Sequence, residues 1–158
     1  LFRYSIILSA DEEPSLADIS LNAAVEDAVA GFYGALTGRG ITPEISICEN
    51  EVIRKLDKGF VSRILGNVLS NALKYSDGDL GVTLSPDGVI TVSNTAASLS
   101  EVQVGRLFDR FYTVEAARSS TGLGLSIAKT LCEKMGGSIS AEYVCPQLSI
   151  IIGFPSEG

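Results

Sequence analysis

The chain has 158 residues, of which 46% are hydrophobic, and it carries 12 basic and 19 acidic side chains, no histidine and a formal net charge of −7. This apolar content excludes a disordered tail, and the acidic balance argues against nucleic acid as a partner, because nucleic-acid-binding modules normally carry a basic surface. The three cysteines lie far apart with no Cys-x-x-Cys pair, so they make neither a zinc site nor a disulfide framework and are expected to be small core residues. No apolar run approaches the roughly 20 residues that span a bilayer, so we expect no membrane contact by this chain.

The opening segment, residues 1–15, is predicted to be the end of an upstream helix followed by a linker, because an apolar stretch precedes Asp11, Glu12, Glu13 and Pro14. The single methionine lies far down the chain, so we expect the sequence to be a piece of a longer protein. Residues 16–158 are expected to form one compact domain.

Two helices are predicted in the first half of the chain. Apolar residues recur at helical spacing over residues 21–36, after a cap at Ser20 or Asn22. The same spacing recurs over residues 61–72, after a cap at Asp57.

Strands dominate the rest of the prediction. Residues 45–47 alternate as a short strand should, and β-hairpins are predicted over residues 80–92 and 139–154. Short helices are predicted over residues 101–111 and 122–135. Several helices with mainly antiparallel strands predict an α/β (α+β) two-layer sandwich, in which helices cover one face of a mixed, mainly antiparallel sheet.

Three polar side chains, Asn67, Asn71 and Lys74, form a narrow stripe along the border of the apolar face of the second helix. Two carboxamides and an ammonium on successive turns offer oxygen to a hard cation and positive charge to a phosphate, as a magnesium-bound nucleotide requires. The alternative is that these side chains mark only the boundary between core and water. Helix geometry alone favours that alternative.

A glycine-rich turn, Ser120-Thr121-Gly122-Leu123-Gly124-Leu125-Ser126, leads directly into the last predicted helix. Glycines let a backbone approach a ligand closely, and the unpaired N–H groups at a helix start form an anion site. The spacing fits neither a Walker loop nor a Rossmann fingerprint. A flexible loop with a helix cap is the alternative.

In this order, four motifs resemble the N, F and glycine boxes of the catalytic ATP-binding domain of bacterial sensor histidine kinases. They are NVLSNALKYS (67–76), LFDRFY (107–112), TGLGLSIAK (121–129) and GG (136–137). The resemblance covers residues 16–155 and implies the Bergerat ATP-binding fold, which is shared with gyrase and MutL ATPases. This architecture agrees with the predicted two-layer sandwich.

The resemblance implies ATP and Mg²⁺ as cofactors. Asn71 would ligate Mg²⁺ through its side-chain oxygen, and Asn67, one turn earlier, would lie near the phosphates. Lys74 would contact phosphate oxygens, while Tyr75 would pack against the adenine or the ribose.

The remaining site residues would come from a lid over the nucleotide and from the glycine-rich turn. Arg110 and Arg118 would be the cations that reach the γ-phosphate, and residues 113–121 would form the lid. Phe108 and Phe111 would either anchor this lid or serve as plain core residues. The phosphate side of the pocket would be lined by Thr121, Gly122, Leu123, Gly124 and Leu125.

The residue type at position 67 bears on the chemistry. ATP-hydrolysing members of the superfamily carry a glutamate there as general base, but a carboxamide such as that of Asn67 cannot take a proton near neutral pH. We therefore expect the chain to hold ATP intact and to transfer its γ-phosphoryl group to a nucleophile. Catalysis would rest on positioning and on charge neutralisation by Mg²⁺, Lys74 and Arg110.

The absence of histidine has a consequence for partners, because the accepting imidazole must come from outside the chain. The resemblance implies a histidine-bearing dimerisation domain upstream in the same protein, a homodimeric parent protein and a response regulator. We expect a cytoplasmic location for this domain and a parent protein anchored in the cell membrane.

The first glycine box departs from the family pattern Asp-x-Gly-x-Gly, whose aspartate accepts a hydrogen bond from the adenine amine. Asn94 stands at the aspartate position, Ala96 and Ser98 replace the glycines, and Leu99 ends the segment. A neutral carboxamide lacks the charge-assisted strength of a carboxylate, so we expect the affinity for ATP to fall.

Three alternatives remain. The altered box allows a catalytically degenerate nucleotide- or partner-binding module of the same fold. An anti-sigma-factor type serine kinase would need no upstream histidine domain, although the F box and the apolar opening over residues 1–8 favour a sensor kinase. A structural α/β domain without a nucleotide would require the order of the motifs to be accidental.

Overall fold

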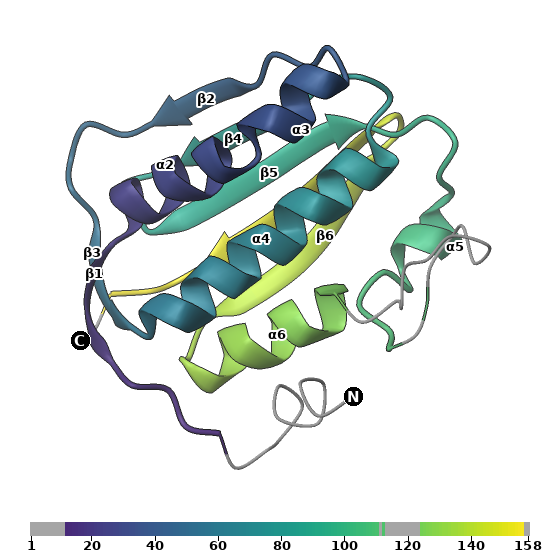
Figure 1. The fold of residues 1–158 in the computed structure, drawn as a ribbon. Helices are drawn as coiled ribbons and strands as arrows, with labels where there is room; N and C mark the ends of the chain where they lie inside the picture. Colours follow the sequence, from purple (N-terminus) through teal and green to yellow (C-terminus); the bar gives the residue numbers. More distant parts are fainter. Residues whose placement is uncertain (1–11, 111, 113–123, 157–158) are drawn as a thin grey trace.

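The computed structural model describes residues 12–110, 112 and 124–156, which form two layers (Figure 1). Helices α2, α4 and α6 lie side by side across one face of a five-stranded sheet, as the sequence predicts. In chain order the elements are β1 (Ala17–Ser20), α2 (Leu21–Gly31), α3 (Tyr33–Gly38), β2 (Glu44–Ile47), β3 (Ile53–Leu56), α4 (Lys58–Tyr75), β4 (Gly81–Leu84), β5 (Val89–Thr95), α5 (Glu101–Val104), α6 (Gly124–Lys134), β6 (Ser138–Val144) and β7 (Gln147–Gly153).

The large sheet has the strand order β2-β4-β5-β7-β6, in which only the β2–β4 pair is parallel. Both predicted hairpins are confirmed, as β4–β5 and as β6–β7. The register of the central pair places Ile90 opposite Ile152 and Val92 opposite Ile150. All four side chains are at most 1% exposed, so this pair forms the floor of the core.

Helix α4 covers the middle of this floor with the apolar face that the sequence predicts. Every residue of that face is buried: Val61, Ile64, Leu65, Val68, Leu69 and Ala72. Burial of one such large aliphatic side chain stabilises the fold by roughly 1.5–3 kcal/mol. The helix is thereby fixed by its packed face, which leaves the side chains along its border for a ligand.

The helix caps agree in part with the prediction. The Asp57 carboxylate caps α4 by accepting a hydrogen bond from Phe60 N at 3.0 Å, as predicted. Ser20 caps α2, and Asn22 instead holds the chain before β3 by accepting from Val52 N at 2.8 Å. The single helix predicted over residues 21–36 is wrong, because the chain breaks at Phe32 into α2 and α3.

Two short strands were not anticipated. β1 and β3 form a separate antiparallel pair in which Ala17 lies opposite Leu56 and Ile19 opposite Arg54. Each strand has four residues, and charged side chains interrupt their apolar alternation. The helix predicted over residues 101–111 is shorter, because α5 ends at Val104 and the chain then continues in turns.

The predicted tail is only partly described, since residues 1–11 lie outside the described residues. Ser15 N donates to the Asp57 carboxylate at 2.7 Å, and Lys134 Nζ donates to the Glu12 carbonyl at 2.7 Å. These bonds fasten the start of the described chain to α4 and α6. In the described part of the chain, no helix is long and apolar enough to cross a membrane.

The prediction for the cysteines holds best for Cys132, which is fully buried on α6. Burial, together with the charge of Glu133, raises the pKa of its thiol to about 12, so Cys132 behaves as a small apolar residue. The prediction is wrong for Cys145, which is exposed because it lies in the turn between β6 and β7.

Candidate functional site

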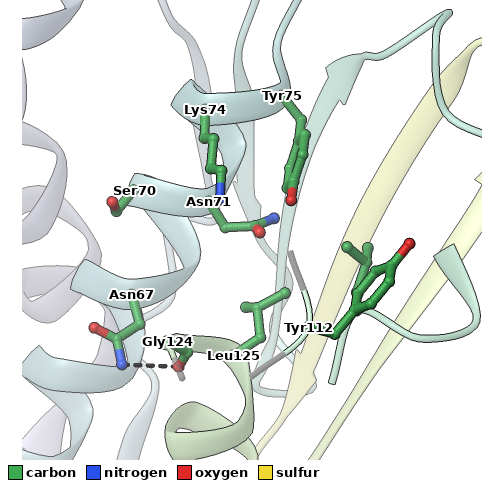
Figure 2. A pocket seen from close by; sticks show the side chains of 9 residues that line it. Asn67, Ser70, Asn71, Lys74, Tyr75, Tyr112, Gly124 and Leu125 are labelled. Atoms are coloured by element: carbon green, nitrogen blue, oxygen red, sulfur yellow. Dashed lines mark hydrogen bonds between the residues drawn. The ribbon is translucent and has the colours of Figure 1, made fainter. Parts of the chain in front are cut away.

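A cavity of about 90 Å³ opens between α4, the first turn of α6 and the segment that follows α5 (Figure 2). It brings together six of the site residues predicted from the sequence, from two distant motifs. Its lining consists of Asn67, Ser70, Asn71, Lys74, Tyr75, Leu107, Tyr112, Gly124 and Leu125.

The polar stripe of α4 faces this cavity because of the helical repeat. Asn67, Asn71 and Lys74 follow one another at spacings of four and three residues, which places them above one another on a helix. All three are half-buried, since the apolar face beside them packs on the sheet. The stripe therefore lines a concave site. This favours a ligand-binding role over the alternative that the three side chains only mark the boundary between core and water.

Asn71 carries a hydrogen-bonding group that no described residue uses. Its Nδ2 atom is buried and has no hydrogen-bond partner among the described residues, whereas most buried polar groups are paired. Figure 2 shows its carboxamide in the middle of the lining residues. A ligand that offers acceptor atoms, together with a cation for the amide oxygen, would satisfy this side chain. The nitrogen and the oxygen of the Asn71 side chain thus suit a phosphate group and the metal ion bound to it.

Asn67 joins the two walls of the cavity. Its Nδ2 atom donates a hydrogen bond to the carbonyl of Gly124, the first residue of α6, at 2.9 Å (Figure 2). The amide nitrogen is therefore occupied by the protein, and a carboxamide has no basic atom near neutral pH. This residue is built to hold the start of α6 against α4 and cannot act as a general base.

The cavity is positive at one side although the whole chain carries a net charge of −7. Lys74 supplies an ammonium, whose Nζ atom lies 5.3 Å from the centre of the Tyr75 ring. The first turn of α6, an 11-residue helix, adds the partial positive charge of a helix N-terminus at Gly124 and Leu125. An anionic ligand is therefore favoured by local geometry and not by overall charge.

Three lining residues were not anticipated as site residues. Helical spacing places Ser70 on the solvent side of α4, and the structure has it exposed at the edge of the cavity. Leu107 and Tyr112 belong to the F box motif, but no periodicity shows which of its side chains turn inward. Tyr112 is held by the Arg106 guanidinium, which lies 4.4 Å from its ring centre.

The segment expected to recognise adenine does not line this cavity. Asn94 is 1% exposed on the buried face of β5, and its Nδ2 atom donates to the Thr95 carbonyl at 3.3 Å. Ala96 and Leu99 are also buried, at 0% and 6% exposure. Contact between these three residues and the adenine base therefore stays a prediction.

This segment is fastened to its surroundings by several hydrogen bonds. Ala96 N donates to the Pro146 carbonyl at 2.7 Å, and Ala97 N donates to the Asp77 carboxylate at 2.8 Å. The Tyr143 hydroxyl lies 2.8 Å from the Ala96 carbonyl oxygen. Hydrogen bonding to a neighbouring thiol and partial burial raise the pKa of Tyr143 to about 12, so the hydroxyl remains a donor.

Asp79 anchors the same segment, and its carboxyl group makes the stability of the fold depend on pH. Burial alone would raise the pKa of this carboxyl group, but hydrogen bonds from Thr95 N and Thr95 Oγ1, both at 2.7 Å, and from Ser76 hold it below the usual 3.8. A depressed folded-state pKa stabilises the fold above the unfolded-state value and loses this contribution as the pH falls through the folded-state value.

We expect Asp79→Asn to lower the free energy of unfolding by about 1 kcal/mol at neutral pH, because hydrogen bonds to a charged group are lost. The difference in free energy of unfolding between the wild type and Asp79→Asn should disappear as the pH falls below 3.8, because the wild-type carboxylate then becomes protonated. Urea unfolding from neutral to acidic pH measures this. A gap that stays constant over this range would contradict the assigned role.

Several predicted residues lie elsewhere. Arg110 is exposed and does not line the cavity, and Phe108 is half-buried against the core, which agrees with a packing role. The expected lid over residues 113–121 lies outside the described residues. The same is true of four predicted site residues and one lid anchor: Arg118, Thr121, Gly122, Leu123 and Phe111.

Comparison with known proteins agrees with the motifs. Residues 56–153 match the family described as histidine kinase-, DNA gyrase B-, and HSP90-like ATPases. The chain is 35% identical over 150 residues to the sensor histidine kinase YcbM of Bacillus subtilis, an alignment that covers 89% of this chain and 48% of YcbM. The chain spans about half or less of the length of the curated relatives that it matches.

Solved structures show the same fold at lower identity. The catalytic domain of histidine kinase ThkA superposes with a TM-score of 0.79 at 20% identity, covering 90% of this chain and 98% of that one. The mycobacterial sensor histidine kinase MprB gives a TM-score of 0.76 at 21% identity, with 89% and 97% covered.

The ordered motifs, the two-layer fold and the family match support one another, and the resemblance drawn from the sequence is confirmed. The chain belongs to the histidine kinase-, DNA gyrase B-, and HSP90-like ATPase family, and the curated relative named above, YcbM, is a sensor histidine kinase.

Proposed function

We propose that the chain binds Mg–ATP in the cavity between α4 and α6 and transfers the γ-phosphoryl group to a histidine of a separate domain. The observation that carries this proposal is the buried Nδ2 atom of Asn71, which has no hydrogen-bond partner among the described residues and lies in one cavity with Lys74 and the N-terminus of α6. These groups together suit a phosphate chain with its metal ion.

The residues divide the work by their chemistry. Asn71 would ligate Mg²⁺ through Oδ1, and the bound ion would neutralise charge on the phosphate oxygens. Lys74 and the first turn of α6 would hold the phosphates, with Gly124 allowing their close approach. Tyr75 would pack against the base or ribose. The cations of Arg110 and Arg118 are proposed for the γ-phosphate.

The rest of the nucleotide site is proposed on the motifs alone. The first glycine box, with Asn94, Ala96 and Leu99, would receive the adenine. The glycine-rich turn that precedes α6 would cover the phosphates. This second group consists of Thr121, Gly122 and Leu123.

The chemistry and the hydrogen bond of the Asn67 side chain favour phosphoryl transfer over ATP hydrolysis. Water attack on ATP needs a base to take a proton, and the cavity offers a carboxamide whose nitrogen is already bonded to Gly124. A nucleophile presented from outside, such as a neutral imidazole, needs no such base. Positioning and charge neutralisation then suffice for the phosphoryl transfer.

The partners proposed for the parent protein follow from this chemistry. The chain contains no histidine, so the acceptor would lie on an upstream dimerisation domain of the same protein, which would be a homodimer. A response regulator would then receive the phosphoryl group. We place the catalytic domain at residues 16–158, after a linker, in the cytoplasm beneath a membrane-anchored parent.

A transfer assay tests the proposal. The chain is mixed with Mg–ATP carrying a radioactive γ-phosphate and with a purified dimerisation domain of its parent protein. We expect label on that domain, in an acid-labile phosphohistidine, with little free phosphate. Chelation of Mg²⁺ or replacement of the acceptor histidine should abolish the label. Binding of ATP without transfer would favour the catalytically degenerate module, and rapid release of phosphate would contradict the role given to Asn67.

A further inference from the structure

The last turn of α4 ends without the usual helical partners for its carbonyl groups. The final helical bond runs from Ser76 N to the Ala72 carbonyl at 2.8 Å. The next three amides, of residues 77–79, donate to the Thr95 carbonyl and to the Ser76 hydroxyl instead. The carbonyls of residues 73–75 would have accepted from these amides and therefore need other donors, and the Ser76 carbonyl lies just beyond the helix.

Arg39, the residue directly after α3, supplies donors. Its Nη1 atom donates to the Leu73 carbonyl, and its Nη2 atom donates to the Ser76 carbonyl at 3.0 Å. The two ends of one planar guanidinium group thus hold two carbonyls that lie three residues apart. A positive charge at this place also complements the partial negative charge of a helix C-terminus.

The backbone of Arg39 is itself held in place. Arg39 directly follows α3, and its N–H donates to the Leu36 carbonyl at 3.1 Å. Leu36 and Ile41, on either side, are 1% and 4% exposed, and Ile41 N also donates to the Leu36 carbonyl, at 2.9 Å. The guanidinium therefore extends from a fixed turn to the end of α4.

We propose that Arg39 is a positioning residue for the nucleotide. Lys74 and Tyr75, which line the cavity, lie between the two residues whose carbonyls Arg39 holds. Arg39 does not line the cavity itself, so it acts through the last turn of α4. This role rests on the proposed function, because it assigns a contribution to Mg–ATP affinity.

Calorimetric titration with Mg–ATP tests this role in the wild-type chain and in the variants Arg39→Gln and Arg39→Lys. Arg63→Gln is the matched control, because it removes the same charge from an exposed position on α4 away from the cavity. We expect Arg39→Gln to raise the Kd about tenfold, since two hydrogen bonds from a charged donor are lost. Arg39→Lys should give an intermediate Kd, because an ammonium can hold one carbonyl but not both. The control should bind as the wild type does.

Urea unfolding of each variant separates positioning from stability. A lower unfolding midpoint for Arg39→Gln with an unchanged Kd of the folded protein would overturn the proposal and leave the proposed function intact. If Arg39→Gln does not fold, a wild-type Kd for Arg39→Lys would overturn it equally. Failure of the wild-type chain to bind Mg–ATP would reject the proposed function, and the role of Arg39 with it.

Discussion

Replacement of Asn71 by alanine should weaken Mg–ATP binding about 100-fold, the largest effect that we expect from one side chain of the cavity. The substitution removes the proposed oxygen ligand of Mg²⁺ and the buried Nδ2 atom, which has no partner in the described part of the chain. Stability should change little, because the Nδ2 atom of the wild-type side chain makes no hydrogen bond to the described residues that the variant could lose. Calorimetry in the presence and absence of Mg²⁺ measures the effect.

The metal dependence makes this test specific. Wild-type affinity for ATP should fall sharply when Mg²⁺ is chelated, whereas the affinity of Asn71→Ala should hardly respond. Asn50→Ala, an exposed asparagine outside the cavity, is the matched control and should behave as the wild type. A variant at position 71 that retains the full Mg²⁺ effect would show that the ion is held elsewhere.

The sequence predicted the large elements well because their apolar patterns are long. The face of α4 repeats over four turns and the β4–β5 and β6–β7 hairpins alternate clearly, so their burial follows from the pattern alone. The β1–β3 pair escaped because Asp18, Arg54 and Lys55 interrupt the apolar alternation of these two short strands. The break at Phe32 escaped because α3 continues the apolar spacing of α2 across it, with Leu36 buried.

The candidate site shows the same division. Asn67, Asn71 and Lys74 share one helix, so the helical repeat places them together, and their meeting with Gly124 and Leu125 follows the order of the motifs. Contributions from irregular segments could not be placed in this way. The inward turn of Leu107 and Tyr112, and the hold of Arg39 on α4, depend on tertiary contacts that no local period records.

The altered glycine box has a structural counterpart in its neighbours. Asp77 and Asp79, at the end of α4, bind the backbone of the loop from one side, and Tyr143 binds it from the other. The loop is therefore held by two carboxylates and a hydroxyl. The Ala96 side chain is fully buried within this anchored segment.

The largest loss of stability is expected from Gly88→Ala, in the turn between β4 and β5. Gly88 has a φ of +84°, and an added Cβ would lie 2.5 Å from the Phe154 carbonyl oxygen. That oxygen also accepts from Arg54 Nε at 2.6 Å, and Phe154 N donates to the Gly88 carbonyl at 3.0 Å. The methyl group would therefore separate the turn, the end of β7 and β3 from one another.

Two further glycines separate the causes of this loss. Gly40 has a φ of +70°, and no atom lies within 4 Å of an added Cβ. Gly40→Ala should therefore lower the free energy of unfolding by about 1 kcal/mol, through the strain of alanine in a left-handed backbone conformation alone. Gly137 has no positive φ, but an added Cβ would lie 2.8 Å from the Gly153 carbonyl oxygen. Gly137→Ala should therefore lower the free energy of unfolding by about 2 kcal/mol, through steric overlap of the Cβ with that oxygen. Gly88→Ala combines both causes and should cost about 3 kcal/mol in urea unfolding. If it costs no more than Gly40→Ala, the close packing of this turn against Phe154 does not hold in solution.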